Sequence, residues 1–215
     1  MKTLWCIRHG ESEANAGLPT EHPATPKLTT LGHSQVELIP PCFPEPPDLI
    51  VTSSYIRTKQ SAAPTIAAFP EAETVEWPVF EFTYVNIEKC KGTTIYERQP
   101  FADQYWERME PFSTDGPGTE SFSQFLERVK TLFSKARASE KQRIAVFTHG
   151  RFMQAVLLAY ITNFPEASVN SMEQYKAFMK VLPIRNGSIM TFTVTDSEIT
   201  LAQPPDNRHC RHLTD

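Results

Sequence analysis

Residues 3–12 read TLWCIRHGES, an apolar run that ends directly in a group of polar residues. The run lacks the alternation of a half-exposed strand and is typical of a parallel strand covered on both faces. Arg8 and His9 then stand at the carboxyl end of that strand. A neutral imidazole is a competent nucleophile toward phosphorus, and a guanidinium beside it binds phosphate oxygens bidentately. Because Gly10 allows the backbone to approach an oxyanion closely, the stretch points to phosphoryl chemistry, although Arg-His pairs also end ordinary strands.

Two later apolar runs repeat this layout. Residues 48–52 (DLIVT) precede Ser53-Ser54, which are good N-cap residues for a helical stretch that carries Arg57. Residues 144–147 (IAVF) run into Thr-His-Gly, with His149 between the strand and a following helix. The sequence therefore predicts three buried strands that each end in residues able to bind an anion.

We expect His9, Arg57 and His149 to converge. Ligands of open α/β sheets bind at the carboxyl edge of the strands. Helix N-termini at that edge add N–H donors and partial positive charge, which favour a phosphate.

Spacing and capping signals predict the remaining elements. The predicted helices cover 30–39, 101–109, 122–136 with a Ser121/Gln124 capping box, 152–160 and 173–181, and a hairpin pairs 188–194 with 198–201. Pro64 is expected to kink or restart the helix that carries Arg57. Residues 74–85 alternate in part, but Trp77-Pro78 argues against an unbroken central strand.

Composition narrows the class of protein. At 215 residues the chain suits one α/β domain with a real core, and a net charge of −4 provides no global basic field for nucleic acid. Its four cysteines are scattered without a C-x-x-C pair, which favours a reducing compartment. No run approaches the ~20 apolar residues of a membrane span, and the stretch before Arg8 is too short for a signal-peptide core. We therefore expect a soluble cytoplasmic protein that binds neither nucleic acid nor membrane.

Short motifs follow one another through most of the chain. They are RHGES at 8–12 with Asn15, KLTTLGH at 27–33, SSYIRTKQSA at 53–62, Glu81, GTESF at 118–122, THG at 148–150 and NGSI at 186–189. In this order they resemble the histidine phosphatase superfamily, in the branch that includes cofactor-dependent phosphoglycerate mutases and fructose-2,6-bisphosphatases. The resemblance implies a three-layer α/β/α sandwich with a mostly parallel central sheet over residues 1–202. It also implies a phosphohistidine intermediate and an enzyme that needs neither a metal nor a cofactor.

The same resemblance assigns catalytic roles. His9 would be the nucleophile, its other ring nitrogen held as N–H by a backbone carbonyl, and Arg8, Arg57 and His149 would form the phosphate pocket around it. Glu81 would give a proton to the leaving oxygen and later activate water. The sequence around this glutamate matches loosely, so three nearby glutamates remain alternatives: Glu76, Glu88 and Glu97.

Further residues have weaker support. Ser12, Asn15 and Gly150 are candidates for phosphate or substrate binding, although the first two also suit turns and caps. Glu120 would line the pocket or simply favour the start of the next helix. A metal at His209-Cys210-Arg211-His212 is disfavoured, because this tail lacks a fourth ligand and a rigid frame. Residues 203–215 are expected to be loosely ordered.

Water or a second phosphate ester can accept the phosphoryl group. Residues 81–99 read EFTYVNIEKCKGTTIYERQ and lack the tyrosine-glycine-leucine pattern and longer insertion of phosphoglycerate mutases, so we expect a phosphatase acting on a small phosphorylated metabolite. A mutase and a non-catalytic phospho-ligand binder remain alternatives, and a homodimer is left open. Residues 80–120 are expected to cover the substrate. Their aromatic residues suit an apolar or ring-bearing leaving group, whereas Lys89, Lys91 and Arg98 suit a second anionic group.

Overall fold

A computed structural model describes residues 1–213. Its centre is a six-stranded sheet in the order β3-β2-β4-β1-β5-β6. The strands are β1 (Lys2–Arg8), β2 (Leu49–Thr52), β3 (Glu73–Glu76), β4 (Arg143–Thr148), β5 (Ile189–Val194) and β6 (Ile199–Asp206). The pairs β1/β4, β4/β2 and β2/β3 are parallel, whereas β5 is antiparallel to both β1 and β6. The carboxyl ends of β1, β2 and β4 therefore meet at one edge, as the three apolar runs predicted.

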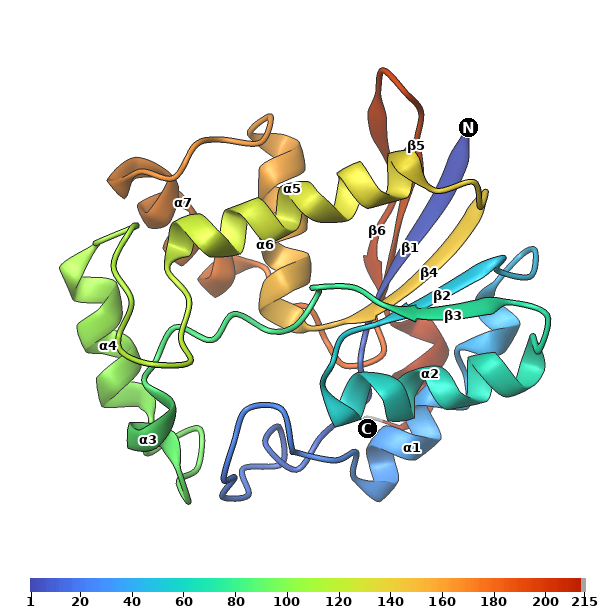
Figure 1. Cartoon of the computed structure of the whole chain (residues 1–215). Coiled ribbons are helices and arrows are strands. Elements are labelled where there is room, and N and C mark those ends of the chain that lie inside the picture. The colour runs from blue at the N-terminus through green and yellow to red at the C-terminus, as the bar shows by residue number, and fades with distance from the viewer. Residues whose placement is uncertain (214–215) are drawn as a thin grey trace.

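Helices cover both faces of the sheet, which confirms the expected three-layer sandwich. They are α1 (Thr30–Val36), α2 (Ile56–Ala68), α3 (Ile87–Cys90), α4 (Gln99–Arg108), α5 (Phe122–Ala138), α6 (Gly150–Ile161) and α7 (Val169–Val181), with short 3-10 helices η1 (Pro40–Cys42) and η2 (Arg208–Leu213). Figure 1 shows α5 and α6 on one side of the strands and α1 and α2 on the other.

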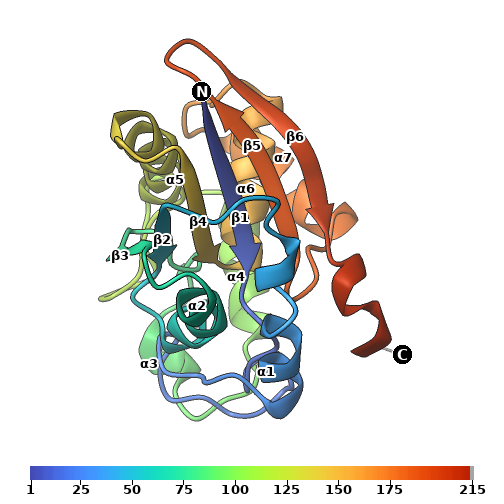
Figure 2. The same ribbon diagram turned by 90° about the vertical axis from the view of Figure 1, so that its right-hand side faces the viewer.

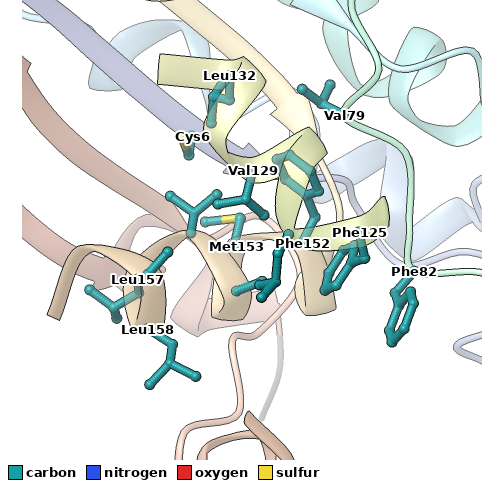
Figure 3. Packing of buried hydrophobic residues seen from close by; sticks show 14 of the residues in the cluster. Cys6, Val79, Phe82, Phe125, Val129, Leu132, Phe152, Met153, Leu157 and Leu158 are labelled. Carbon is teal, nitrogen blue, oxygen red and sulfur yellow. The ribbon is translucent and has the colours of Figure 1, made fainter. Parts of the chain in front are cut away.

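The central strand β1 packs on both helical layers. Leu4 and Cys6 belong to the core cluster formed with α5, α6 and α7, whereas Trp5 and Ile7 point into the cluster formed with α1 and α2. Apolar side chains are thus required on both faces, which explains the missing alternation. Figure 3 shows the larger cluster, where Phe125, Val129 and Leu132 of α5 lie against Phe152 and Met153 of α6.

Some element boundaries differ from the prediction. The helix α2 begins at Ile56 with Tyr55 as its N-cap, and the Ser53 hydroxyl accepts the N–H of Tyr55 rather than an N–H of the helix itself. It continues through Pro64 without a restart and loses only the hydrogen bond that a proline nitrogen cannot donate. The helix α7 begins earlier than expected, at Val169, where Ser168 and Ser171 form a capping box.

The chain between β3 and α3 leaves the sheet at Trp77. The Trp77 N–H donates to the Thr52 carbonyl at 3.0 Å, but the next residue, Pro78, has no N–H to continue the ladder. Phe82 and Tyr84 are buried in the core cluster with α5, α6 and α7. The alternating pattern of 74–85 was thus a sign of one-sided burial rather than of a long strand.

The expectation of a loosely ordered tail is wrong for residues 203–213. The strand β6 continues to Asp206 and η2 follows it to Leu213, as Figure 2 shows at the sheet edge. Pro204 and Pro205 fit there because an edge strand does not need every N–H for pairing. The thiol of Cys210 is buried and donates to the Gln35 carbonyl of α1 at 3.6 Å, which anchors this segment. Thr214 and Asp215 lie outside the described residues.

Across residues 1–213, no helix combines the length and apolar character needed to cross a membrane.

Candidate active site

His9 follows β1 directly and is almost fully buried. Its Nδ1 lies 2.6 Å from the Gly10 carbonyl, to which it donates, and its Nε2 accepts from the Nε of Arg57 at 3.1 Å. Burial, and then the charges of Arg57 and Arg8, hold the pKa of His9 well below its ordinary value, although the carbonyl bond opposes them. The ring is therefore neutral, with its proton on Nδ1 and its lone pair on Nε2. This is the arrangement that a nucleophilic histidine requires.

Arg8 lies against the start of α6. One nitrogen of its guanidinium donates to the Ile184 carbonyl, and its Nε is buried with no hydrogen-bond partner among residues 1–213. A Cβ at Gly150 would lie 3.2 Å from that Nε, so the glycine provides the room for Arg8. An unpaired buried donor is costly, and an anionic oxygen is the partner that would relieve the cost.

Arg57 brings a second guanidinium to the same place from the first turn of α2. Besides its bond to His9, it donates from Nη1 to the Pro23 carbonyl at 2.7 Å. Burial lowers the pKa of Arg57 to about 10, so the side chain remains charged at neutral pH.

His149 is the N-cap residue of α6, and the centroid of its ring lies 5.2 Å from that of His9. Its Nε2 is 2.9 Å from the Ser53 hydroxyl, and its Nδ1 is buried without a partner in the described chain. Burial, followed by the charge of Arg57, keeps the pKa of His149 well below the ordinary value. When the Ser53 hydroxyl donates to Nε2, the proton of neutral His149 stands on Nδ1, where it is a donor for an oxyanion.

Glu81 lies at the N-terminus of the helix that His149 caps. Its carboxylate accepts the backbone N–H groups of Phe82, Arg151 and Phe152 at 3.1, 3.3 and 3.2 Å. A carboxylate is favoured at this end of a helix dipole. The bonds to α6 fix Glu81 relative to His149, so the local packing positions the two side chains together.

A cavity of about 560 Å³ gathers most of the predicted site residues. Its lining includes Arg8, His9, Ser12, Asn15, Arg57, Glu81 and Gly150. The alternative glutamates Glu76, Glu88 and Glu97 do not line it, which leaves Glu81 as the carboxylate of the original set beside His9.

Ser12 and Asn15 form one wall of this cavity. The Ser12 hydroxyl donates to the Asn15 Oδ1 at 3.0 Å, and the Nδ2 of Asn186 donates to the same oxygen at 3.1 Å. Asn186 also donates to the His9 carbonyl at 3.0 Å, so it links Asn15 to His9. The amide oxygen of Asn15 is thus used internally, whereas its Nδ2 makes no hydrogen bond within residues 1–213 and is available as a donor.

Comparison with known proteins identifies the family of this chain. The model of the histidine phosphatase superfamily (branch 1) matches residues 4–198. The chain belongs to that superfamily. An adenosylcobalamin/alpha-ribazole phosphatase of Salmonella typhi is 27% identical over 171 residues, which cover 77% of this chain and 82% of that protein. The family expected from the motifs is therefore confirmed.

Solved structures of this superfamily share the fold. The alpha-ribazole phosphatase from Shigella flexneri has a TM-score of 0.70 with 21% identity, covering 95% of this chain and 96% of that one. A mycobacterial glucosyl-3-phosphoglycerate phosphatase in complex with VO3 has a TM-score of 0.69 with 20% identity, covering 94% and 98%.

Glu120 does not line the cavity of this histidine phosphatase, so the first of its two expected roles is not supported. Its carboxylate instead accepts from Arg128, with Nε to Oε2 at 2.8 Å and Nη2 to Oε1 at 2.5 Å. It also accepts the Thr83 N–H at 3.3 Å. Glu120 therefore holds the segment that carries Glu81, and its charge is already paired.

The sequence reasoning missed two residues of the site. Ser53 was interpreted only as a helix cap, but its hydroxyl bonds His149. Arg151 lines the cavity and bonds the hydroxyl of Tyr84, although the THG motif had been read only as far as Gly150. The one available signal was position: Ser53 directly follows β2, and Arg151 lies in the first turn of the helix that follows β4.

In the part of the chain that the structure describes, no group of three or more His, Cys, Asp or Glu side chains is placed to hold a metal ion.

Proposed function

We propose that this histidine phosphatase hydrolyses small phosphate monoesters through a phosphohistidine on His9, without a metal ion. The observation that carries the proposal is the state of the His9 ring, with a carbonyl on Nδ1 and the lone pair on Nε2 inside a cavity that Arg8 and Arg57 also line. Membership of the superfamily and the phosphatase relatives support it.

In the first step the Nε2 of His9 attacks phosphorus, and the bond from phosphorus to the ester oxygen breaks. Arg8, Arg57 and the Nδ1–H of His149 donate to the three equatorial oxygens, the role that magnesium has in many phosphotransfer enzymes. The negative charge of the bound ester favours the protonated form of Glu81, which gives its proton to the leaving oxygen, so the product is a neutral alcohol.

In the second step water attacks the phosphorus of phosphohistidine while Glu81, now a carboxylate, takes the proton of the water. The bond from Nε2 to phosphorus breaks, inorganic phosphate leaves and Glu81 is again protonated. The sum is one ester plus one water giving one alcohol plus one phosphate, with the enzyme unchanged.

Residues 80–120 supply the wall that faces the leaving group. Apolar side chains from this stretch that line the cavity are Phe82, Val85, Ile87, Ile95, Tyr96 and Ala102. The wall favours a leaving group with an organic body of some size over a bare small alcohol. Two of the similar proteins are named for esters with a leaving group of this size, an alpha-ribazole phosphatase and a glucosyl-3-phosphoglycerate phosphatase.

The test is hydrolysis of p-nitrophenyl phosphate in the presence of EDTA. We expect activity in the wild type and in His33→Ala, which changes an exposed histidine of α1, and loss of at least about 10²-fold in His9→Ala. Protein quenched in alkaline detergent, in which the P–N bond of phosphohistidine survives, should carry label from a ³²P substrate only when His9 is present. Equal activity in His9→Ala and His33→Ala would refute the mechanism, and activity lost with EDTA would refute metal independence.

We also propose a cytoplasmic location. Its support is that Cys6, Cys42, Cys90 and Cys210 are all free thiols, as expected in a reducing compartment.

A further inference from the structure

The cavity contains a basic residue that the proposed reaction does not use. Arg151 is the second residue of α6, one position beyond Gly150, and it lines the same cavity as His9 and Glu81. Its backbone N–H donates to the Glu81 carboxylate, while its side chain reaches the Tyr84 hydroxyl in the cavity wall. Its guanidinium is therefore beside the phosphate pocket but is not part of it.

The guanidinium of Arg151 has spare hydrogen-bonding capacity. One nitrogen donates to the Tyr84 hydroxyl, and the guanidinium carbon lies 4.9 Å from the centroid of the Tyr84 ring. These are the only side-chain contacts recorded for its polar atoms in residues 1–213, and a guanidinium has five N–H donors. None of its unpaired nitrogens is among the buried polar atoms without a partner, so each of them keeps some exposed surface on a residue that lines the cavity.

No carboxylate neutralises Arg151 directly. Every ion pair found among the described residues joins other side chains, so no acidic oxygen lies within 4.0 Å of this guanidinium. Burial lowers the pKa of Arg151, but the neighbouring Tyr84, Tyr175 and Glu81 outweigh it and shift the pKa upward, so the group is charged. A charged arginine in a partly desolvated wall, without an anionic partner, is an energetic cost unless a ligand supplies the anion.

The other basic residues of this region are not available for that role. Arg98 lines the cavity, but it bonds the Thr20 hydroxyl at 2.6 Å, the Thr93 hydroxyl at 2.9 Å and the carbonyls of both residues. It therefore joins two loops. Lys89 pairs with Asp115, and neither Lys89 nor Lys91 lines the cavity.

Resting on the phosphatase activity proposed above, we infer that Arg151, together with the Tyr84 hydroxyl, binds a second anionic group on the leaving-group part of the substrate. The substrate class is then a phosphate monoester that also carries a carboxylate or a second phosphate. A guanidinium fork matches either oxyanion with two parallel hydrogen bonds, and the phenol adds a third donor. Recognition of this kind acts on the leaving group and leaves the reacting phosphoryl to Arg8 and Arg57.

The experiment uses matched substrate pairs that differ only in the second group. 3-Phosphoglycerate is compared with glycerol 3-phosphate, 6-phosphogluconate with sorbitol 6-phosphate, and fructose 1,6-bisphosphate with fructose 6-phosphate. The readout is the ratio of kcat/KM within each pair. The first two pairs report a carboxylate at two chain lengths, and the third reports a phosphate. A charge-assisted pair is worth about 1.5–3 kcal/mol, so we expect the wild type to prefer one anionic member by roughly 10-fold to 100-fold.

Arg151→Gln should reduce that ratio to near one, and Arg151→Lys should keep part of it. Tyr84→Phe, which keeps the ring and removes only the hydroxyl, should lower the ratio with less risk to folding. Lys91→Gln removes an exposed charge outside the cavity and should leave the ratio as in the wild type.

The outcomes separate the two proposals. If Arg151 merely supports Glu81 or the fold, its replacement slows both members of a pair equally and the ratio persists, which overturns the inference. A wild type that releases phosphate from p-nitrophenyl phosphate but shows no anionic preference in any pair overturns it as well. A wild type inactive on every ester refutes the proposed function itself.

Discussion

The buried pair of Glu120 and Arg128 should be the most sensitive polar contact outside the cavity. Both side chains are only 12% exposed, and the guanidinium also donates to the carbonyls of Pro78 and Phe80 at 2.9 and 3.0 Å. Its carbon lies 3.7 Å from the centroid of the Phe80 ring. Arg128→Met would leave the Glu120 charge unpaired and free two backbone acceptors just before Glu81.

We expect Arg128→Met to lower the free energy of unfolding by about 3–5 kcal/mol, the usual cost of breaking a buried ion pair by removing one partner. Glu120→Gln should cost a similar amount because it leaves the guanidinium unpaired. In the double variant neither charge remains, so its loss should be smaller than the sum of the single losses by at least about 2 kcal/mol. The exposed pair of Lys59 and Glu76 provides the comparison, and Lys59→Met should cost under ~1 kcal/mol.

Equilibrium unfolding in urea, followed by circular dichroism, measures all of these values. Additivity of the two single variants within about 0.5 kcal/mol would refute the reasoning, as would a loss for Arg128→Met no larger than that for Lys59→Met. Since the pair anchors the segment before Glu81, kcat on p-nitrophenyl phosphate should fall in both single variants under conditions where they remain folded.

Two other predictions concern the histidines. His9 and His149 are held neutral with pKa values well below 6.5, whereas histidines of the unfolded chain titrate near that value, so unfolding takes up protons below it. Stability should therefore fall as the pH drops below 6.5, by roughly 1 kcal/mol per pH unit for each histidine. Urea titrations from pH 7.5 to 5.5 should give a shallower slope in His9→Asn, and an equal slope contradicts the prediction. Ser53→Ala removes the hydroxyl that orients His149 and should lower kcat roughly 10-fold. The exposed neighbour supplies the control, Ser54→Ala, and equal rates in the two variants would exclude an orienting role.

The parts of the fold that the sequence predicted well are those fixed by local composition. The runs ending at Arg8 and before His149 have apolar side chains on both faces, and only a covered parallel strand needs that pattern. Because such strands share one carboxyl edge, the convergence of His9, Arg57 and His149 followed from chain order and topology alone.

The parts that failed depend on partners distant in the sequence. The role of Glu120 was missed because its partner Arg128 also binds the segment after β3, whose path the sequence does not reveal. The ordered C-terminal segment was missed because a single buried thiol, that of Cys210, anchors a stretch that is otherwise polar. Arg151 could not be distinguished from an ordinary polar residue of a helix start until its place in the cavity was known.

The hydrogen bond from Arg57 to the Nε2 of His9 affects when the imidazole can react. In the free protein this donor covers the lone pair that attacks phosphorus in the proposed mechanism. An incoming phosphate dianion is a stronger acceptor than a neutral imidazole, so we expect Arg57 to transfer its bond to the ligand and to free the Nε2 of His9 at the same time. We therefore expect an electrophile without anionic oxygens to meet an imidazole whose lone pair is already hydrogen-bonded. A phosphate ester, in contrast, would displace Arg57 from Nε2 as it binds.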